Sequence, residues 1–194
     1  IMDKGEGIIY ALGQFFTEGG AQFVSDDGSK ADGYINSDAS VKTAEYLNEF
    51  IKNGYANLDP VKDEFLNGKA ATLLGGSWNI ADLEKSNLNW GVSYFPVADD
   101  GKAASPTGDW AAITKDSKNP DAAGKFLQWA MDSDNIASYA SAVAKPASRT
   151  SSYEKMEGWD SGARALMKWQ LQNTGVSRPR TPSYSVLSTD FSTA

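Results

Sequence analysis

Apolar residues recur at helical spacing in several segments, most clearly in residues 119–133. Asn119 can cap a helix there, Pro120 suits the first helical position, and apolar residues follow three and four positions apart. This pattern predicts a helix with one buried face. The side chains predicted to line that face are Ala123, Phe126, Leu127, Ala130 and Met131.

Residues 38–54 show a similar pattern, with Asp38 or Ser40 as the N-cap and Gly54 at the end. Further helices are predicted at residues 59–68, 133–143 and 160–173, the first two starting at Asp59-Pro60 and Ser133. The buried positions predicted for residues 38–54 are Val41, Ala44, Leu47, Phe50 and Ile51, and those for residues 160–173 are Ala163, Leu166, Met167 and Leu171.

Strand patterns are fewer and shorter than helix patterns. They occur at residues 69–76, 89–97 and 110–114, where apolar runs or alternating residues end at glycine or proline. Three short strands among helices indicate an α/β class, with a small mixed sheet covered by several helices, rather than a sandwich or a bundle. We therefore expect a helix-rich domain.

Composition places the chain among globular proteins. Its 194 residues are 41% hydrophobic and 22% charged, enough for a self-sufficient core in a single domain. A net charge of −7 argues against nucleic acid as a partner, and the small basic group of Arg178 and Arg180 is interpreted as a solvated loop. No apolar run approaches the length of a membrane span. Because the chain starts at Ile1 without a signal-peptide pattern, we expect a processed protein or an excised piece.

Histidine and cysteine are both absent. Their absence removes thiolate nucleophiles, disulfides, histidine acid–base chemistry and nearly all zinc or copper sites. We also find no GxSxG elbow and no glycine loop that would cradle phosphate. The sequence therefore predicts a protein that is not an enzyme and that needs neither a cofactor nor a metal.

The order of several motifs resembles the extracellular solute-binding proteins of carbohydrate ABC importers, the family that includes maltose-binding protein. The most specific stretch is FLNGKAATLLGGSW, which is similar to the family's Gly-Lys-Ala-Ala, short strand and Gly-x-Trp. The other stretches are EGIIYALGQFFTEGGAQFVSDDG, NWGVSYFPVADDGK, SKNPDAAGKFLQW, AKPASR and RPRTPSY, and together they cover nearly the whole chain in family order.

This resemblance implies one lobe of a type II periplasmic-binding-protein-like fold. Residues 1–194 would form most of the C-terminal lobe of a two-lobed protein, without the N-terminal lobe and the last helices. It also implies a monomer outside the cytoplasm, extracellular or periplasmic and attached by a lipid anchor. Such a protein captures a mono- or oligosaccharide by closure of its lobes and delivers it to membrane permease subunits.

A sugar site needs flat aromatic surfaces flanked by hydrogen-bonding groups. Trp78 follows Gly75-Gly76-Ser77 after a predicted strand, and glycine at such a turn lets backbone approach a ligand. The resemblance places a stacking tryptophan at this position. The alternative for Trp78 is a core residue that covers a sheet edge.

Asp109 and Trp110 form a second candidate, since an ionised carboxylate beside an indole face can accept two hydroxyl hydrogen bonds. The alternative is ordinary Gly-Asp turn chemistry followed by a buried strand residue. The remaining tryptophans are assigned mainly to packing; they are Trp90, Trp129, Trp159 and Trp169.

Four other residues complete the candidate set. Tyr10 and Gln14 lie in the aromatic first segment and would reach the cleft floor, or else simply pack into the lobe. Tyr184 matches a family position near the cleft, although packing explains it equally well. Arg149 could bind a sugar hydroxyl, but a structural ion pair is the safer interpretation.

Two other functions remain open. A fragment of a glycoside hydrolase would need two carboxylates flanking one glycosidic bond, and only Asp109 has a place in the cleft by this reasoning. A carbohydrate-interaction module without a transport role is the second alternative.

Overall fold

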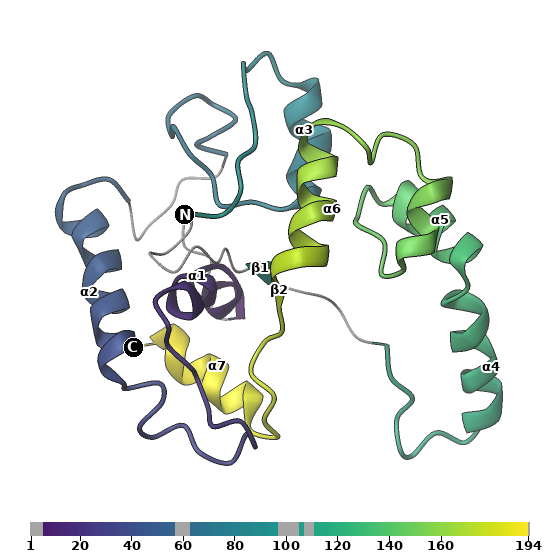
Figure 1. Ribbon diagram of the computed structural model, residues 1–194, viewed down its shortest axis with the longest axis horizontal. Helices are drawn as coiled ribbons and strands as arrows, with labels where there is room; N and C mark the ends of the chain where they lie inside the picture. Colours follow the sequence, from purple (N-terminus) through teal and green to yellow (C-terminus); the bar gives the residue numbers. More distant parts are fainter. Residues whose placement is uncertain (1–5, 57–62, 97–104, 107–110, 194) are drawn as a thin grey trace. The chain divides into compact units, whose positions relative to one another are not determined.

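The computed structural model describes residues 6–56, 63–96, 105–106 and 111–193 (Figure 1). Helices dominate this part of the chain, as expected from the sequence. In chain order the elements are α1 (Glu6–Glu18), α2 (Asp38–Lys52), η1 (Ser77–Asn79), α3 (Ile80–Lys85), β1 (Ser105–Pro106), α4 (Pro120–Ala130), α5 (Ser133–Ala142), η2 (Thr150–Lys155), α6 (Gly162–Thr174), β2 (Gly175–Val176) and α7 (Tyr184–Thr193).

Strand structure in the described residues is limited to one parallel pair, β1 and β2, with Ser105 opposite Gly175 and Pro106 opposite Val176. The predicted strands do not form: residues 69–76, 89–96 and 111–114 are not in strands, and the rest of these segments lies outside the described residues. Alternation of apolar and polar residues indicates that a segment suits a half-buried strand. A strand also needs a neighbouring strand to pair with, and the sequence pattern of one segment does not specify that partner.

The chain divides into two compact units. The first unit contains Ile1–Leu74, Tyr94–Thr107 and Gln172–Ala194, and the second contains Gly75–Ser93 and Gly108–Leu171.

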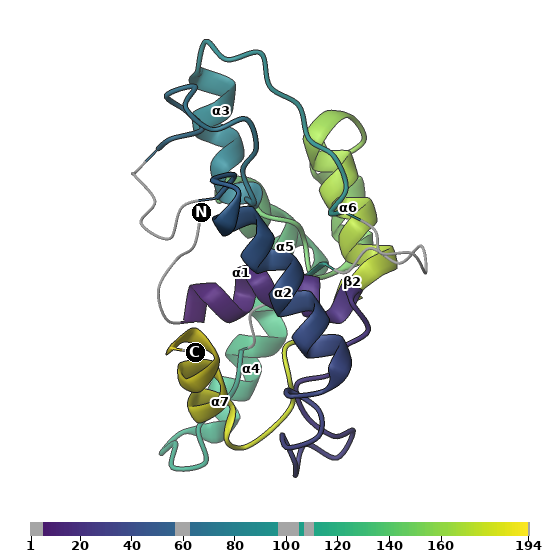
Figure 2. The ribbon, with the colours of Figure 1, turned by 90° about the vertical axis from the view of Figure 1, so that its left-hand side faces the viewer.

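The first unit is built on α1, which contacts both α2 and α7 (Figures 1 and 2). Its core holds three aromatic rings, with Phe16, Phe23 and Phe191 at centroid separations of 5.1 to 5.8 Å. Aromatic pairs at such distances stabilise a core in addition to the stabilisation that comes from their buried surface area. Gly13 is buried against this core, and a Cβ at this position would be in van der Waals contact with the Phe23 ring at 3.4 Å.

Helix α2 starts and ends close to the predicted residues, but its buried face is not the predicted one. Ser37 is the N-cap, accepting a hydrogen bond from the Ser40 amide at 3.3 Å, and Gly54 follows the helix with a φ of +72°. The buried residues are Ser40 and Thr43, whereas Val41 is 50% exposed.

The hydrogen bonds of these two side chains explain the change of face. Ser40 donates to the Tyr34 carbonyl at 3.1 Å and Thr43 donates to the Ala39 carbonyl at 2.9 Å, so neither polar group is buried unsatisfied. The Thr43 side chain also occupies the space where a Cβ on Gly19 would stand. Tertiary contacts thus override the apolar periodicity. Of the other predicted positions, Leu47 and Ile51 are half-buried, while Ala44 and Phe50 are exposed.

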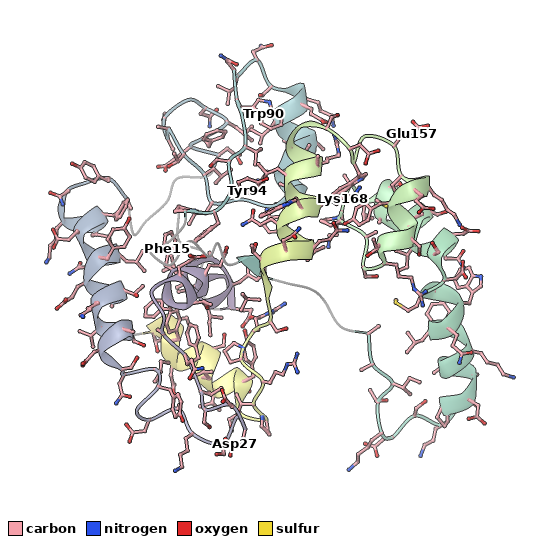
Figure 3. All side chains as sticks on the ribbon, in the orientation of Figure 1. Phe15, Asp27, Trp90, Tyr94, Glu157 and Lys168 are labelled. Atoms are coloured by element: carbon pink, nitrogen blue, oxygen red, sulfur yellow. The ribbon has the colours of Figure 1, made fainter. Side chains whose placement is uncertain are left out.

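The core of the second unit lies between α5 and η2. Trp159 is only 2% exposed, and its ring lies 5.6 Å from that of Tyr153. Lys168, labelled in Figure 3, places its Nζ 4.9 Å from the centre of the Tyr153 ring. Core packing was predicted for Trp159, and the structure confirms it. The core residues are Ile136, Ala137, Ala140, Ala147, Tyr153, Met156 and Trp159, with Met167 of α6 packed against them.

Helix α4 begins at Pro120 after Asn119, as predicted, yet none of its residues is fully buried. Phe126 and Met131 of its predicted apolar face are exposed, and Trp129 is 62% exposed. Packing was therefore the wrong expectation for Trp129, and also for Trp169 of α6, which is exposed. The Asn119 side chain forms no cap hydrogen bond, so Pro120 at the first helical position is the local signal that marks this start. Burial depends on neighbouring elements that such a signal does not specify.

The starts of α5 and α6 differ little from expectation, whereas α1, α3 and α7 were not predicted. Helix α5 begins at Ser133, but Asp132 is its cap and accepts the Asp134 amide at 3.0 Å. Helix α6 contains the predicted Ala163, Leu166, Met167 and Leu171, all half-buried. The helix predicted at residues 59–68 begins outside the described residues, and its described part forms turns.

Candidate functional site

In the first unit, the Glu6 carboxylate joins α1 to the last part of the chain. Its Oε1 accepts hydrogen bonds from Arg178 Nη1 at 2.8 Å and from the Tyr184 hydroxyl at 2.6 Å. Its Oε2 accepts one from the Ser188 hydroxyl at 2.5 Å. Both carboxylate oxygens are thus occupied, by donors that lie 172 to 182 residues away in sequence.

The electrostatics of this cluster favour the ionised Glu6. Partial burial alone would raise the pKa of Glu6, but hydrogen bonds from Ser188, Tyr184 and Arg178 outweigh it and hold the pKa below its ordinary value. For Tyr184, burial comes first and the hydrogen bond to Glu6 second, and together they raise the pKa to about 12. The Tyr184 hydroxyl therefore stays protonated at neutral pH and remains a donor to Glu6.

Tyr10 and Gln14 are one helical turn apart on α1 and therefore share a face of this helix. The guanidinium carbon of Arg178 lies 5.6 Å from the centre of the Tyr10 ring, a cation–π distance. The Gln14 amide donates to the carbonyls of Tyr10 and Ala11, both at 3.3 Å. Both side chains are half-buried. Tyr10 and Tyr184 belong to one connected group, because Arg178 contacts the Tyr10 ring and Glu6 accepts hydrogen bonds from both Arg178 and Tyr184.

In the second unit, Trp78 lies on η1 and is 56% exposed. Its ring lies against Gly76, where any Cβ would overlap the indole. Asn79 stabilises the turn with two hydrogen bonds. Its side-chain Oδ1 accepts one from the Gly76 backbone N–H at 3.1 Å, and its own backbone N–H donates one to the Gly76 carbonyl at 3.0 Å. This arrangement presents an indole surface to solvent on a hydrogen-bonded turn, which excludes the interpretation of Trp78 as a core residue.

The other candidates have different positions. Asp109 and Trp110 lie outside the described residues. Arg149 is exposed at the start of η2, and within the described parts of the chain it forms no ion pair, so the expected structural ion pair is absent there. Trp90, labelled in Figure 3, is half-buried.

Sequence reasoning missed Glu6, Arg178 and Ser188. Arg178 was interpreted as a solvated loop residue, but it pairs with Glu6 and contacts Tyr10. The available signal was a carboxylate in the first turn of an aromatic segment, together with an arginine beside a proline-rich return. These are weak signals, because the two residues are 172 positions apart.

Neither a metal site nor a membrane span is visible in the described residues. They contain no group of three or more acidic residues arranged to hold a metal ion. Within the same ranges, no helix has the length and apolar character needed to cross a bilayer.

Comparison with known proteins identifies relatives. A sequence profile for bacterial extracellular solute-binding proteins matches residues 3–166. The maltodextrin-binding protein MdxE of Bacillus subtilis (strain 168) is 28% identical over 129 residues, which are 60% of this chain and 30% of that protein.

Solved structures agree in fold. The cyclic alpha-maltosyl-1,6-maltose binding protein from Arthrobacter globiformis matches with a TM-score of 0.77 at 22% identity, over 98% of this chain and 50% of its own. The maltose-binding periplasmic protein MalE from Listeria monocytogenes, in complex with maltose, matches with a TM-score of 0.71 at 21% identity, over 91% and 49%.

The chain thus spans about half the length of these solved proteins. Because the sequence identities to these solved proteins are only 21–22%, the similarity establishes the fold and nothing further. This fold is that of periplasmic sugar-binding proteins. The profile match extends over most of the sequence. This chain belongs to the bacterial extracellular solute-binding protein family.

Proposed function

We propose that this chain is most of the C-terminal lobe of a two-lobed carbohydrate-binding protein that serves an ABC importer. The observation that carries this proposal is the family match over residues 3–166. The names of the relatives support sugar as the ligand class, since each describes a protein that binds maltose, maltodextrin or a cyclic maltosyl-maltose. Because the chain covers about half of the solved relatives, the second lobe would come from polypeptide outside these 194 residues.

The described side chains have the chemistry that a sugar needs. A pyranose ring offers an apolar C–H face and a rim of hydroxyls, so it binds to exposed aromatic rings with hydrogen-bonding neighbours. Trp78 offers an exposed indole in the second unit, with Gly76 beneath it. Tyr10 and Gln14 are candidates in the first unit, where the Tyr10 ring contacts Arg178 and the Gln14 amide donates to carbonyls of its own helix. Asp109, Trp110, Tyr184 and Arg149 remain candidate ligand residues.

Binding would work by closure of the two lobes. A sugar that contacts both lobes stabilises the closed form by the difference between its affinities for the closed and open states. The closed protein would then engage the permease subunits. We place this step outside the cytoplasm, with a lipid anchor as the means of attachment and a monomer as the working form.

Isothermal titration calorimetry of the complete two-lobed protein tests the proposal. The panel contains maltose, maltotriose, cellobiose, mannobiose and raffinose, with product analysis after each titration. We expect saturable binding of at least one sugar and no hydrolysis. Release of shorter products would instead indicate a glycoside hydrolase, and no affinity for any sugar would point to a module without a transport role.

The 194 residues alone should bind the same sugar weakly or not at all, because the contacts of the other lobe are missing while the cost of association remains. Micromolar affinity of this chain by itself would contradict the two-lobe mechanism. The comparison needs a folded chain, which circular dichroism with a cooperative thermal transition would establish.

A further inference from the structure

Two exposed Asn-Gly dipeptides of the described residues lie in turns of the same kind. They are Asn53-Gly54, directly after α2, and Asn67-Gly68. Both glycines adopt the left-handed backbone conformation, with a φ of +72° at Gly54 and +67° at Gly68. In each turn the glycine amide donates to the carbonyl three residues earlier at 3.0 Å, and the next amide donates to the carbonyl five residues earlier at 2.8 Å. The two dipeptides therefore share one backbone hydrogen-bond pattern.

An Asn-Gly dipeptide can react with itself in water. The glycine nitrogen gives up its proton and forms a bond to Cγ of the asparagine, and the bond from Cγ to the side-chain nitrogen breaks with release of ammonia. Water then opens the cyclic succinimide at one of its two carbonyls and leaves aspartate or isoaspartate. Glycine favours this attack because it has no side chain to obstruct the approach. Asparagine is a thermolabile residue for this reason.

The two asparagine side chains differ in their hydrogen bonds. The side-chain amide of Asn53 donates to the Glu49 carbonyl at 2.7 Å, at the end of a helix of 15 residues. Attack on Cγ of Asn53 requires this bond to break. In the described part of the chain, the exposed Asn67 side chain forms no hydrogen bond. Cγ of Asn67 can therefore turn towards the Gly68 nitrogen without losing a side-chain partner.

The backbone around Asn67 also favours local opening. Residues 63–69 form turns rather than a helix, and Asp63 has a φ of +61°, which is unfavourable for a residue other than glycine. The Asp63 carbonyl accepts the Asn67 amide at 2.9 Å, so the strained residue is part of the same turn. Short exposed segments held by few hydrogen bonds open at low free energy. Opening releases the Gly68 nitrogen from the Phe65 carbonyl and makes it available for attack.

We propose that Asn67 is a site of spontaneous succinimide formation, and that the hydrogen bond to Glu49 protects Asn53 although a glycine follows it as well. The product at position 67 carries a negative charge two residues before Lys69. Its isoaspartate form also adds a methylene to the backbone, which disrupts the hydrogen bonds that close the turn from Phe65 to Lys69. This modification site is independent of the proposed function, because the reaction needs no ligand.

Peptide mapping of the complete two-lobed protein, after incubation at mildly alkaline pH, measures both reactions in one sample. Trypsin cuts after Lys52, Lys62 and Lys69, so the two dipeptides fall in separate peptides, residues 53–62 and 63–69. Each reaction raises the mass of its peptide by about one dalton, and fragment ions assign the change to one residue. We expect peptide 63–69 to convert at least about fivefold faster, the factor that corresponds to one ordinary hydrogen bond.

Incubation in urea is the matched control, because unfolding removes the hydrogen bond of Asn53 together with both turns. The two peptides should then convert at similar rates. Asn67→Gln should stop the conversion of peptide 63–69 and leave peptide 53–62 unchanged, since the longer side chain closes a ring far more slowly. Equal conversion in the folded protein, or conversion of peptide 63–69 only in urea, would overturn the assignment. A fivefold difference that persists in urea would refute the protective role of the Glu49 carbonyl.

Discussion

Replacement of Trp78 by alanine in the complete protein removes the aromatic candidate that is most exposed among the described residues. A tryptophan side chain presents roughly 250 Å², and since Trp78 is 56% exposed, about 140 Å² faces solvent. If a sugar ring covers half of this area, about 70 Å² of apolar surface is buried on binding. At about 25 cal/mol per Å², the contact is worth about 1.8 kcal/mol, or about a twentyfold change in Kd.

Calorimetric titration of wild type and Trp78→Ala with the sugar that binds measures this loss directly. Trp129→Ala is the matched control, because Trp129 is similarly exposed at 62% but belongs to no candidate site. Its replacement should leave the Kd unchanged. An unaltered Kd in a folded Trp78→Ala protein, or an equal loss in Trp129→Ala, would show that Trp78 is not a sugar platform.

Three further predictions concern stability and ionisation. Gly28→Ala should destabilise the protein by about 2–4 kcal/mol in thermal or urea unfolding, since Gly28 has a φ of +70° and a Cβ there would meet the carbonyl of Arg180. Gly33→Ala is its control, with a φ of +83° but no neighbour within 4 Å, and should cost only about 1–2 kcal/mol; equal losses would refute the packing argument. Trp159→Ala should cost about 3–5 kcal/mol, because the ring is 2% exposed in the core of the second unit, and a loss below 1 kcal/mol would contradict that burial. Asp27, labelled in Figure 3, accepts hydrogen bonds from the hydroxyls of Ser25 and Ser29 and from the Ser29 backbone amide, and these bonds lower the pKa of Asp27 from 3.8 to about 2. Since the folded pKa is the lower one, this contribution to stability is complete above about pH 4 and disappears as the pH falls through 2; a carboxyl NMR titration with a midpoint near 4 would refute it.

The positions of α2, α4, α5 and α6 could be predicted from the sequence because their signals are local, whereas α1, α3 and α7 were not predicted. Pro120 marks the start of α4, and Gly54 marks the end of α2. Burial was predicted less well. On α2, the small polar Ser40 and Thr43 face the core because they find backbone carbonyl acceptors and a close approach to Gly19, which no hydrophobic period can reveal.

The candidate residues likewise include one with a local sequence signal and a pair without such a signal. The exposed position of Trp78 follows from the glycine turn before it, a signal of a few residues. The ion pair of Glu6 and Arg178 depends on folding that brings residues 172 positions apart together. Charge alone suggested a solvated loop for Arg178, since proline-flanked arginines have no preferred partner in the sequence. The contact of Arg178 with Tyr10 likewise joins residues far apart in sequence and has no local signal.

The most direct test of the account is a crystal structure of the complete two-lobed protein with a bound oligosaccharide. We predict that side-chain atoms of Trp78 lie within about 4 Å of the sugar, with the other lobe closing over it. A sugar held without contact to Trp78 would contradict the assignment of this chain as one wall of a carbohydrate-binding cleft.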